Sequence, residues 1–232
     1  MMDRVGVPYG ERFEEMVAEL RGSGSIDLTY ERRDPQRSLG AEAVELLESL
    51  SATGFPSSAM LGDCYVPNSR LAIGWRGVGE YAELGGACDI NPIPVCLEME
   101  VPVDSFANND ADSRLLNEMY VFDEITQYGE TWMTALRFVP ASKSLEVWYL
   151  DRDLPLSRMS IDYCEYLDYV LLTKGVDRWQ LLFTSLDLSD PVMRRPLLRD
   201  VEIMIRLFPT LFPEQDYEPL RIRLEERLAG RP

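Results

Sequence analysis

In this 232-residue chain the side chains best suited to acid–base chemistry or metal binding are carboxylates, because the chain contains no histidine. Without histidine it lacks the Ser-His-Asp and Cys-His arrangements of nucleophilic catalysis and the HExxH zinc site. Glu98 and Glu100 lie two positions apart in a segment that we predict to be a strand, so they would share one face, with Asp104 close behind. Such a pair could serve glycoside hydrolysis or bind Mg²⁺. A Glu-x-Glu pair is also frequent on exposed strands, and we favour that interpretation, with no catalytic residue, no metal site and no cofactor.

The acidic side chains are concentrated in one part of the chain. The formal net charge is −17, and residues 80–130 contain twelve carboxylates and a single basic residue, Arg114. A stretch of one sign attracts and orients cationic partners, although acidic loops can equally be solvated without any partner. Nucleic acid is excluded as a partner, since an acidic domain repels phosphates and no basic stripe with interleaved aromatic residues is present.

Composition indicates a globular protein that neither spans a membrane nor carries a secretion signal. The chain is 46% hydrophobic, has no apolar run long enough for a transmembrane helix, and begins without an apolar leader segment. Its four cysteines, Cys64, Cys88, Cys96 and Cys164, show no CxxC spacing. We therefore expect free, mostly buried thiols in a reducing cytoplasm.

Hydrophobic periodicity predicts an α+β fold, with a mainly antiparallel sheet flanked by helices. The main domain would cover residues 1–189, and a helical C-terminal extension would cover 190–232. Helices are predicted at Tyr9–Leu20, Leu39–Ser51, Ile161–Gly175 (with Ser160 as N-cap), Val192–Phe208 and Glu218–Leu228, and in part of Leu115–Tyr128. Strands are predicted at Ile26–Tyr30, Leu71–Trp75, Val95–Val101, Trp132–Val139 and Leu145–Leu150, the last two as a hairpin. Trp75, Trp132, Trp148 and Trp179 are predicted to lie in the core or at its edge.

Three sequence blocks between residues 145 and 183 indicate a more specific kind of α+β domain. They read LEVWYLDRD, IDYCEYLDYVLLTKG and VDRWQLLF, which place a hairpin, an acidic turn, a helix and Gly-x-x-x-Trp-Gln-x-x-Phe in that order. This order resembles the C-terminal part of the SMI1/KNR4 (SUKH) superfamily over residues 132–186, with weaker support around Trp75. The family's usual opening, a Leu-Pro followed by a helix and an Asn-Gly-Gly-like turn, is not seen here.

The resemblance implies an α+β fold and a binding function without catalytic residues. Bacterial members of the family are immunity proteins that sit in the cytoplasm and bind a cognate toxin domain, often a nuclease, whereas others are regulatory scaffolds. Because a nuclease holds phosphates on a cationic surface, an acidic inhibitor could be steered to that surface and cover it. The hypothesis is therefore an acidic immunity protein with a basic protein partner, and the alternatives are a regulatory scaffold or a carboxylate-dependent hydrolase. The oligomeric state stays open.

The predicted partner-binding residues are Asp104, Asp110, Asp112, Glu118, Tyr120, Phe122, Asp123, Glu124 and Tyr128. The alternative is that the aromatic residues lie in the core and the acidic residues are solvated.

Overall fold

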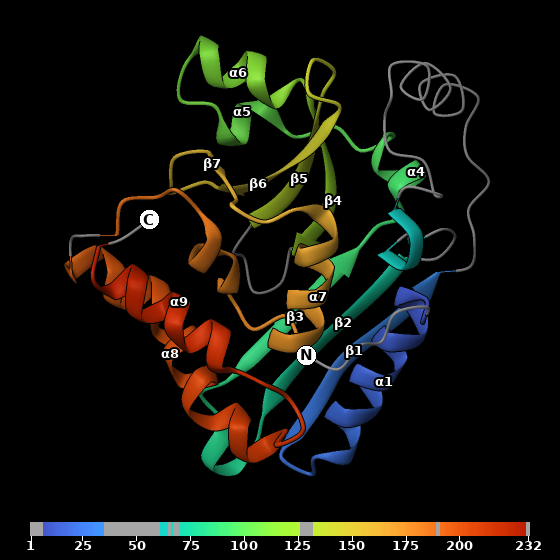
Figure 1. Ribbon diagram of the computed structural model, residues 1–232, viewed down its shortest axis with the longest axis vertical. Helices are drawn as coiled ribbons and strands as arrows, with labels where there is room; N and C mark the ends of the chain where they lie inside the picture. Colours follow the sequence, from blue (N-terminus) through green and yellow to red (C-terminus); the bar gives the residue numbers. More distant parts are fainter. Residues whose placement is uncertain are drawn as a thin grey trace.

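A computed structural model describes residues 7–34, 61–64, 66, 70–125, 132–188 and 191–230 (Figure 1). Its centre is a seven-stranded antiparallel sheet in which each strand lies beside its neighbour in the chain, in the order β1 to β7. The fold is therefore α+β with a helical C-terminal part, as the sequence predicts. The strands are β1 (Ile26–Asp34), β2 (Arg70–Gly77), β3 (Gly85–Ile90), β4 (Met119–Ile125), β5 (Trp132–Val139), β6 (Ser144–Asp151) and β7 (Ser157–Arg158).

Helices cover the two faces of this sheet unequally. The α-helices are α1 (Tyr9–Gly22), α4 (Ile93–Cys96), α5 (Val103–Phe106), α6 (Asp110–Leu116), α7 (Tyr163–Thr173), α8 (Pro191–Leu211) and α9 (Glu218–Leu228), and the 3-10 helices are η1 (Gly62–Cys64), η2 (Gly79–Tyr81) and η4 (Trp179–Phe183). In Figure 1, α1, α7, α8 and α9 gather around the lower half of the view, and α5 and α6 form a separate projection at the top. Among the described residues, no helix combines the length and the apolar character needed to cross a bilayer.

Strand alternation divides the buried residues into two cores. On β5, Trp132 and Leu136 belong to the main core with α1, α7, α8 and α9, while Met133 and Ala135 belong to a smaller core under α5 and α6. Successive side chains of a strand point to opposite faces of the sheet, so alternate residues of β5 enter the two cores. Trp75, Trp132 and Trp179 are at most 2% exposed and Trp148 is half-buried, which confirms the predicted placement of all four tryptophans.

Several predicted elements are confirmed. Helix α1 buries Phe13, Met16, Val17 and Leu20 as its spacing indicates. The β5–β6 hairpin and helix α9 are found where they were predicted, and β1 extends the predicted Ile26–Tyr30 strand to Asp34. The predicted helix Leu39–Ser51 lies outside the described residues.

Other predictions are wrong at a few residues. The predicted strand Val95–Val101 is replaced by helix α4 and a turn, because Pro94 lies in the first helical turn, where a missing N–H costs nothing. The predicted partial helix Leu115–Tyr128 ends early, since α6 stops at Leu116 and β4 begins at Met119. Ser160 is not the N-cap of α7.

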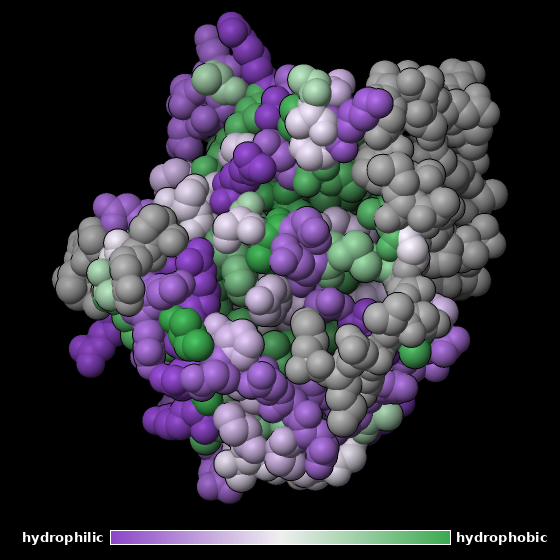
Figure 2. All heavy atoms as spheres, in the orientation of Figure 1, coloured by the Kyte–Doolittle hydropathy of each residue, from purple (hydrophilic) through white to green (hydrophobic). Residues whose placement is uncertain are grey.

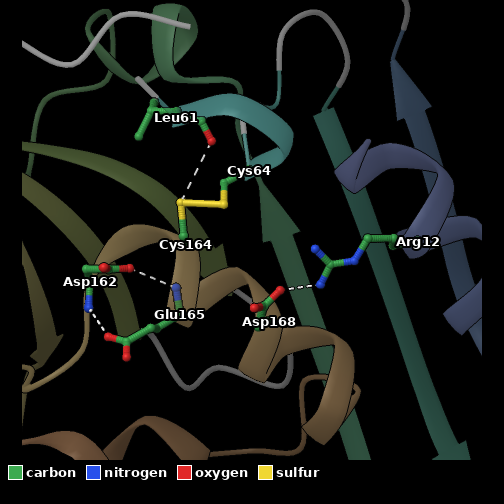
Figure 3. The surroundings of a disulfide bond; sticks show 7 residues. All are labelled: Arg12, Leu61, Cys64, Asp162, Cys164, Glu165 and Asp168. Atoms are coloured by element: carbon green, nitrogen blue, oxygen red, sulfur yellow. Dashed lines mark hydrogen bonds and ion pairs between the residues drawn. A yellow bond between two sulfur atoms is a disulfide. The ribbon is translucent and has the colours of Figure 1, made fainter. Parts of the chain in front are cut away.

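The N-cap of α7 is Asp162, and an ion pair one turn further along connects the helix to α1 (Figure 3). The Asp162 carboxylate accepts a hydrogen bond from the Glu165 N–H at 2.9 Å, and Glu165 accepts one from the Asp162 N–H at 2.8 Å. This capping box satisfies two N–H groups that a helix start leaves open. Asp168, one turn further, pairs with Arg12 of α1.

The prediction of four free thiols is wrong for two of them. Cys64 of η1 and Cys164 of α7 form a disulfide, with their Cα atoms 5.3 Å apart (Figure 3). They are 100 residues apart in the chain, so their spacing carried no signal of the pair. Cys88 and Cys96 are free and buried, and burial raises the pKa of both thiols.

Lys174 joins the C-terminal helices to the rest of the core. It follows the last residue of α7 in a left-handed conformation (φ 53°), and its side chain is fully buried. Its Nζ lies 2.6 Å from Glu19 of α1 and 4.3 Å from the centre of the Phe212 ring, which follows α8. Its carbonyl accepts a hydrogen bond from Trp75 Nε1 at 2.6 Å. Helices α8 and α9 thus share the main core with α1 and the sheet.

Because of the disulfide, we predict that the free energy of unfolding of the protein depends on redox conditions. Replacing Cys64 and Cys164 together by serine should lower the free energy of unfolding by about 2–5 kcal/mol, because the open chain gains conformational freedom in the unfolded state. Chemical denaturation followed by tryptophan fluorescence, with and without reductant, measures this change. Reductant should shift the wild-type transition to that of the double variant and leave the double variant unchanged; a wild-type transition indifferent to reductant would contradict the prediction.

Candidate functional site

Helices α5 and α6 form a small acidic projection, which we call the α5–α6 cap (residues 103–116). It rests on the second core, to which Phe106 and Leu116 of the cap contribute. The Asn109 side chain caps α6 by accepting hydrogen bonds from the N–H groups of Ala111 at 2.9 Å and Asp112 at 3.0 Å. Asp110 and Asp112 therefore lie in the first turn of α6, where the helix dipole favours negative charge. In Figure 2 the cap forms a hydrophilic tip at the top of the molecule.

Four predicted partner-binding residues are brought together on the cap or beside it. Asp104, Asp110 and Glu118 are exposed, and Asp112 is half-buried. Asp112 accepts hydrogen bonds within the cap, from the Asn108 N–H at 3.0 Å and from Asn109 Nδ2 at 3.1 Å. The cap thus holds its carboxylates on a short element with its own internal hydrogen bonds.

Two predicted partner-binding residues, Phe122 and Asp123, are corrected by the structure, since both are 0% exposed. A β-bulge in β4, between Val121 and Asp123, directs both side chains to the main core, where strict alternation would have placed one on each face. The Phe122 ring packs against Tyr166 of α7, with ring centres 4.8 Å apart. Neither residue can contact a partner in this fold.

The other three predicted residues have different fates. Tyr120 is half-buried and packs against the main core, and Glu124 is half-buried on β4. Tyr128 lies outside the described residues. The aromatic anchors predicted from the sequence are therefore mostly core residues, as the alternative interpretation held.

The acidic segment as a whole does not form a single anionic face. Glu83 precedes β3 and its carboxylate is 3.3 Å from Arg199 in the middle of α8, and α8 lies at the other end of the molecule from the cap (Figure 1). Asp89 pairs with Arg70, and Glu118 accepts hydrogen bonds from Arg137 at 2.7 and 2.8 Å. The concentration of carboxylates in the sequence therefore does not produce one acidic surface, because strands β3 and β4 carry the segment across the molecule.

Asp123 forms the centre of a buried polar network. Its carboxylate accepts hydrogen bonds from Tyr166 Oη at 2.6 Å and from the Asp89 N–H at 2.8 Å. Tyr166 Oη also lies 3.0 Å from Thr134 Oγ1 and accepts a hydrogen bond from Gln180 Nε2 at 3.2 Å. Burial raises the pKa of Asp123 to about 7, against the lowering effect of its two hydrogen bonds. The network joins three strands to α7 and η4, so its role is to hold these elements together.

The carboxylate pair proposed for hydrolysis does not form. The Glu98 N–H donates to the Val95 carbonyl in the turn after α4, and Glu100 makes an isolated bridge to Tyr120, so the two glutamates share no strand face. Asp104 lies further on, in α5. No group of three potential metal ligands occurs in the part of the chain that the structure describes.

A charged network beside the cap was missed at the sequence level. On the face of the sheet that carries the cap, Arg137 bridges Glu118 and Glu146, and Glu146 also pairs with Arg158 at 3.1 Å. The half-buried Trp148 donates from Nε1 to Glu146 at 3.1 Å. The β5–β6 register places Arg137 opposite Glu146, and a register derived from the hairpin turn could have found that pair. We call the cap and these residues together the cap-side surface.

Comparison of the chain with protein-family models, with characterised proteins and with solved structures finds no match. The resemblance to the SMI1/KNR4 superfamily therefore stays a prediction.

Asp123 predicts an unusual dependence of stability on pH. Its pKa is raised from 3.8 to about 7 in the folded state, so the contribution of this group is complete below pH about 4 and is lost as pH rises through 7. Asp123→Asn should flatten this part of the profile, which amounts to at most about 4 kcal/mol for the wild type. Urea denaturation at a series of pH values between 4 and 8 measures it. A wild-type profile that rises over this window, or a variant with the same slope as wild type, would contradict the assignment.

Proposed function

We propose that this chain is a non-catalytic binding protein of the SMI1/KNR4 type, which neutralises a basic protein partner, namely a toxin domain such as a nuclease. The observation that carries the proposal is the α5–α6 cap, an acidic element that projects from the sheet on a core of its own. Asp110 and Asp112 are placed by the capped first turn of α6, and Asp104 is placed by the neighbouring helix α5.

The size of the cap suits electrostatic steering. At physiological ionic strength the screening length is about 8 Å, so only carboxylates close to the contact assist binding. Asp104 lies in α5 and Asp110 and Asp112 lie in α6, two short neighbouring helices, so they satisfy this condition better than a segment spread over the molecule. Steering of this kind raises the association rate, whereas aromatic side chains such as Trp148 beside the cap would supply the lasting part of the affinity.

The order of elements also supports this type of protein. The three sequence blocks that carry the resemblance correspond to the end of the β5–β6 hairpin, helix α7 and the 3-10 helix η4. Trp179 and Phe183 of the Trp-Gln-x-x-Phe block pack together, with ring centres 6.0 Å apart. The spacing of Trp179 and Phe183 in that block thus has a packing reason.

The proposed compartment is the cytoplasm, as for the family's immunity proteins. The Cys64–Cys164 disulfide is the observation that favours an oxidising compartment instead, because reducing compartments keep thiols open. Thiol labelling of the protein in intact cells separates the two, since only a cytoplasmic, reduced protein would label at both cysteines.

The main test of the function is co-purification with the product of the adjacent gene at low and at high salt. Asp104→Asn combined with Asp110→Asn should weaken binding by about tenfold at low salt, with the difference disappearing at high salt. The matched control is Glu80→Gln combined with Glu214→Gln, which removes the same charge from exposed residues outside the cap, in η2 and between α8 and α9. Equal losses in the two double variants, or binding indifferent to salt, would contradict the role of the cap.

A growth-protection assay on the same variants distinguishes the second candidate function, a regulatory scaffold. A scaffold would bind through the cap-side surface without protecting cells from any toxin. Loss of growth protection in the cap variant, alongside loss of binding, favours the immunity function.

A further inference from the structure

The Cys64–Cys164 disulfide lies where a thiol from outside the protein can reach it. Both of its cysteines are half-buried, whereas Cys88 and Cys96 are each 1% exposed, and burial raises the pKa of their thiols. Thiol–disulfide exchange needs a thiolate as the attacking group and access to the sulfur that it attacks. Among the four cysteines of the chain, exchange in the folded protein is therefore confined to this one pair.

Helix α7, on one side of the bond, is held in place by contacts that do not involve the disulfide. Its start is closed by the capping box, and Asp168 pairs with Arg12 of α1 (Figure 3). Deeper in the core, Tyr166 donates a hydrogen bond to Asp123 of β4 at 2.6 Å. Cleavage of the disulfide therefore leaves α7 folded and packed on the sheet.

The 3-10 helix η1, on the other side of the bond, is a much shorter element. It has three residues, and 3-10 hydrogen bonds have poorer geometry than those of an α-helix, so packing must hold η1 in place. Leu61, directly before it, packs on the main core, and its carbonyl oxygen lies 4.0 Å from the Cys164 sulfur (Figure 3). Val66, which follows η1, is 3% exposed in the main core. With the bond cleaved, η1 is the part that loosens, and Val66 limits how far this extends toward β2.

We propose that the Cys64–Cys164 disulfide is a redox switch, which a dithiol reductant opens in the folded protein to release η1 from α7. A thiolate of the reductant attacks one sulfur and forms a mixed disulfide with it, while the other sulfur leaves as a thiolate. The second thiol of the reductant then displaces the remaining protein sulfur. Two electrons pass to the protein, the two protons of the dithiol end on Cys64 and Cys164, and the reductant leaves as its own disulfide.

The switch is reversible and local. Because α7 and Val66 stay in place, the reduced cysteines remain near each other, and an oxidised dithiol closes the bond again by the reverse steps. Opening uncovers the first turn of α7, where Cys164 lies. The α5–α6 cap rests on the second core and is unaffected. The inference goes beyond the proposed function and does not depend on any partner.

The rate of reduction by dithiothreitol tests whether the bond opens in the folded protein. The full oxidised chain is reduced at a series of urea concentrations below its unfolding transition, and alkylation followed by mass spectrometry counts the reduced cysteines. The rate should change by less than about twofold over this range, because access does not require unfolding. A rate that rises steeply with urea, as the unfolded population does, or no reduction below the transition, would show a purely structural disulfide and overturn the proposal.

Hydrogen–deuterium exchange of the oxidised and reduced chains tests what the switch releases. Reduction should accelerate exchange in η1, while the cap (residues 103–116) and the β5–β6 hairpin exchange as in the oxidised protein. Unchanged exchange in η1 would overturn the proposal. Faster exchange throughout the sheet would do so as well, because reduction would then loosen the whole fold.

Cysteine variants provide the matched controls. Cys64→Ser should exchange in η1 as the reduced wild type does, with or without reductant. Cys96→Ala, which removes a buried thiol instead, should keep the redox response. In the reduced wild type, Cys64 and Cys164 should react with an alkylating reagent at least about 100-fold faster than Cys88 and Cys96, because only the first pair is accessible in the folded state. Equal reactivity of all four thiols would contradict a local opening.

Discussion

The contact between Tyr166 of α7 and Asp123 of β4 is the interaction on which the rest of the fold depends. Both residues are 0% exposed, and the hydrogen bond between them is 2.6 Å long. Around it, Thr134 and Gln180 bring in β5 and η4, and the Asp89 N–H brings in β3. A buried polar network that is well bonded specifies one arrangement, because every alternative packing would leave a carboxyl group without partners in the core. The bulge in β4 makes this possible by turning Asp123 inward.

The two faces of the sheet that this network holds together are covered differently. On one side of the sheet the main core binds α1, α7, α8 and α9 into a single layer, tied by Lys174 and by the Cys64–Cys164 disulfide. On the other side the second core supports only the short cap. The cap therefore lies on the face of the sheet opposite to the one that these four helices cover.

The elements with strong periodicity could be predicted from the sequence, and the reason is local. Helix α1, the β5–β6 hairpin and α9 each contain enough apolar spacing to determine their own structure. The predicted strand after Pro94 failed because proline is also suited to the first turn of a helix. The disulfide could not be foreseen, since its cysteines meet only through the fold.

The candidate site was predicted less well, for a related reason. The charge count located the cap, but it could not separate exposed from buried carboxylates within one strand. Asp123 shows this most clearly, because the β4 bulge is a property of the paired strands and carries no distinct pattern in the sequence.

The most direct test of the central claim is hydrogen–deuterium exchange of the protein alone and in complex with its co-purifying partner. We expect added protection in residues 103–116 of the cap and in the adjoining strand β6, because the partner would cover them. Protection confined to α9 or to the outer edge of β1, with the cap exchanging as in the free protein, would contradict the account.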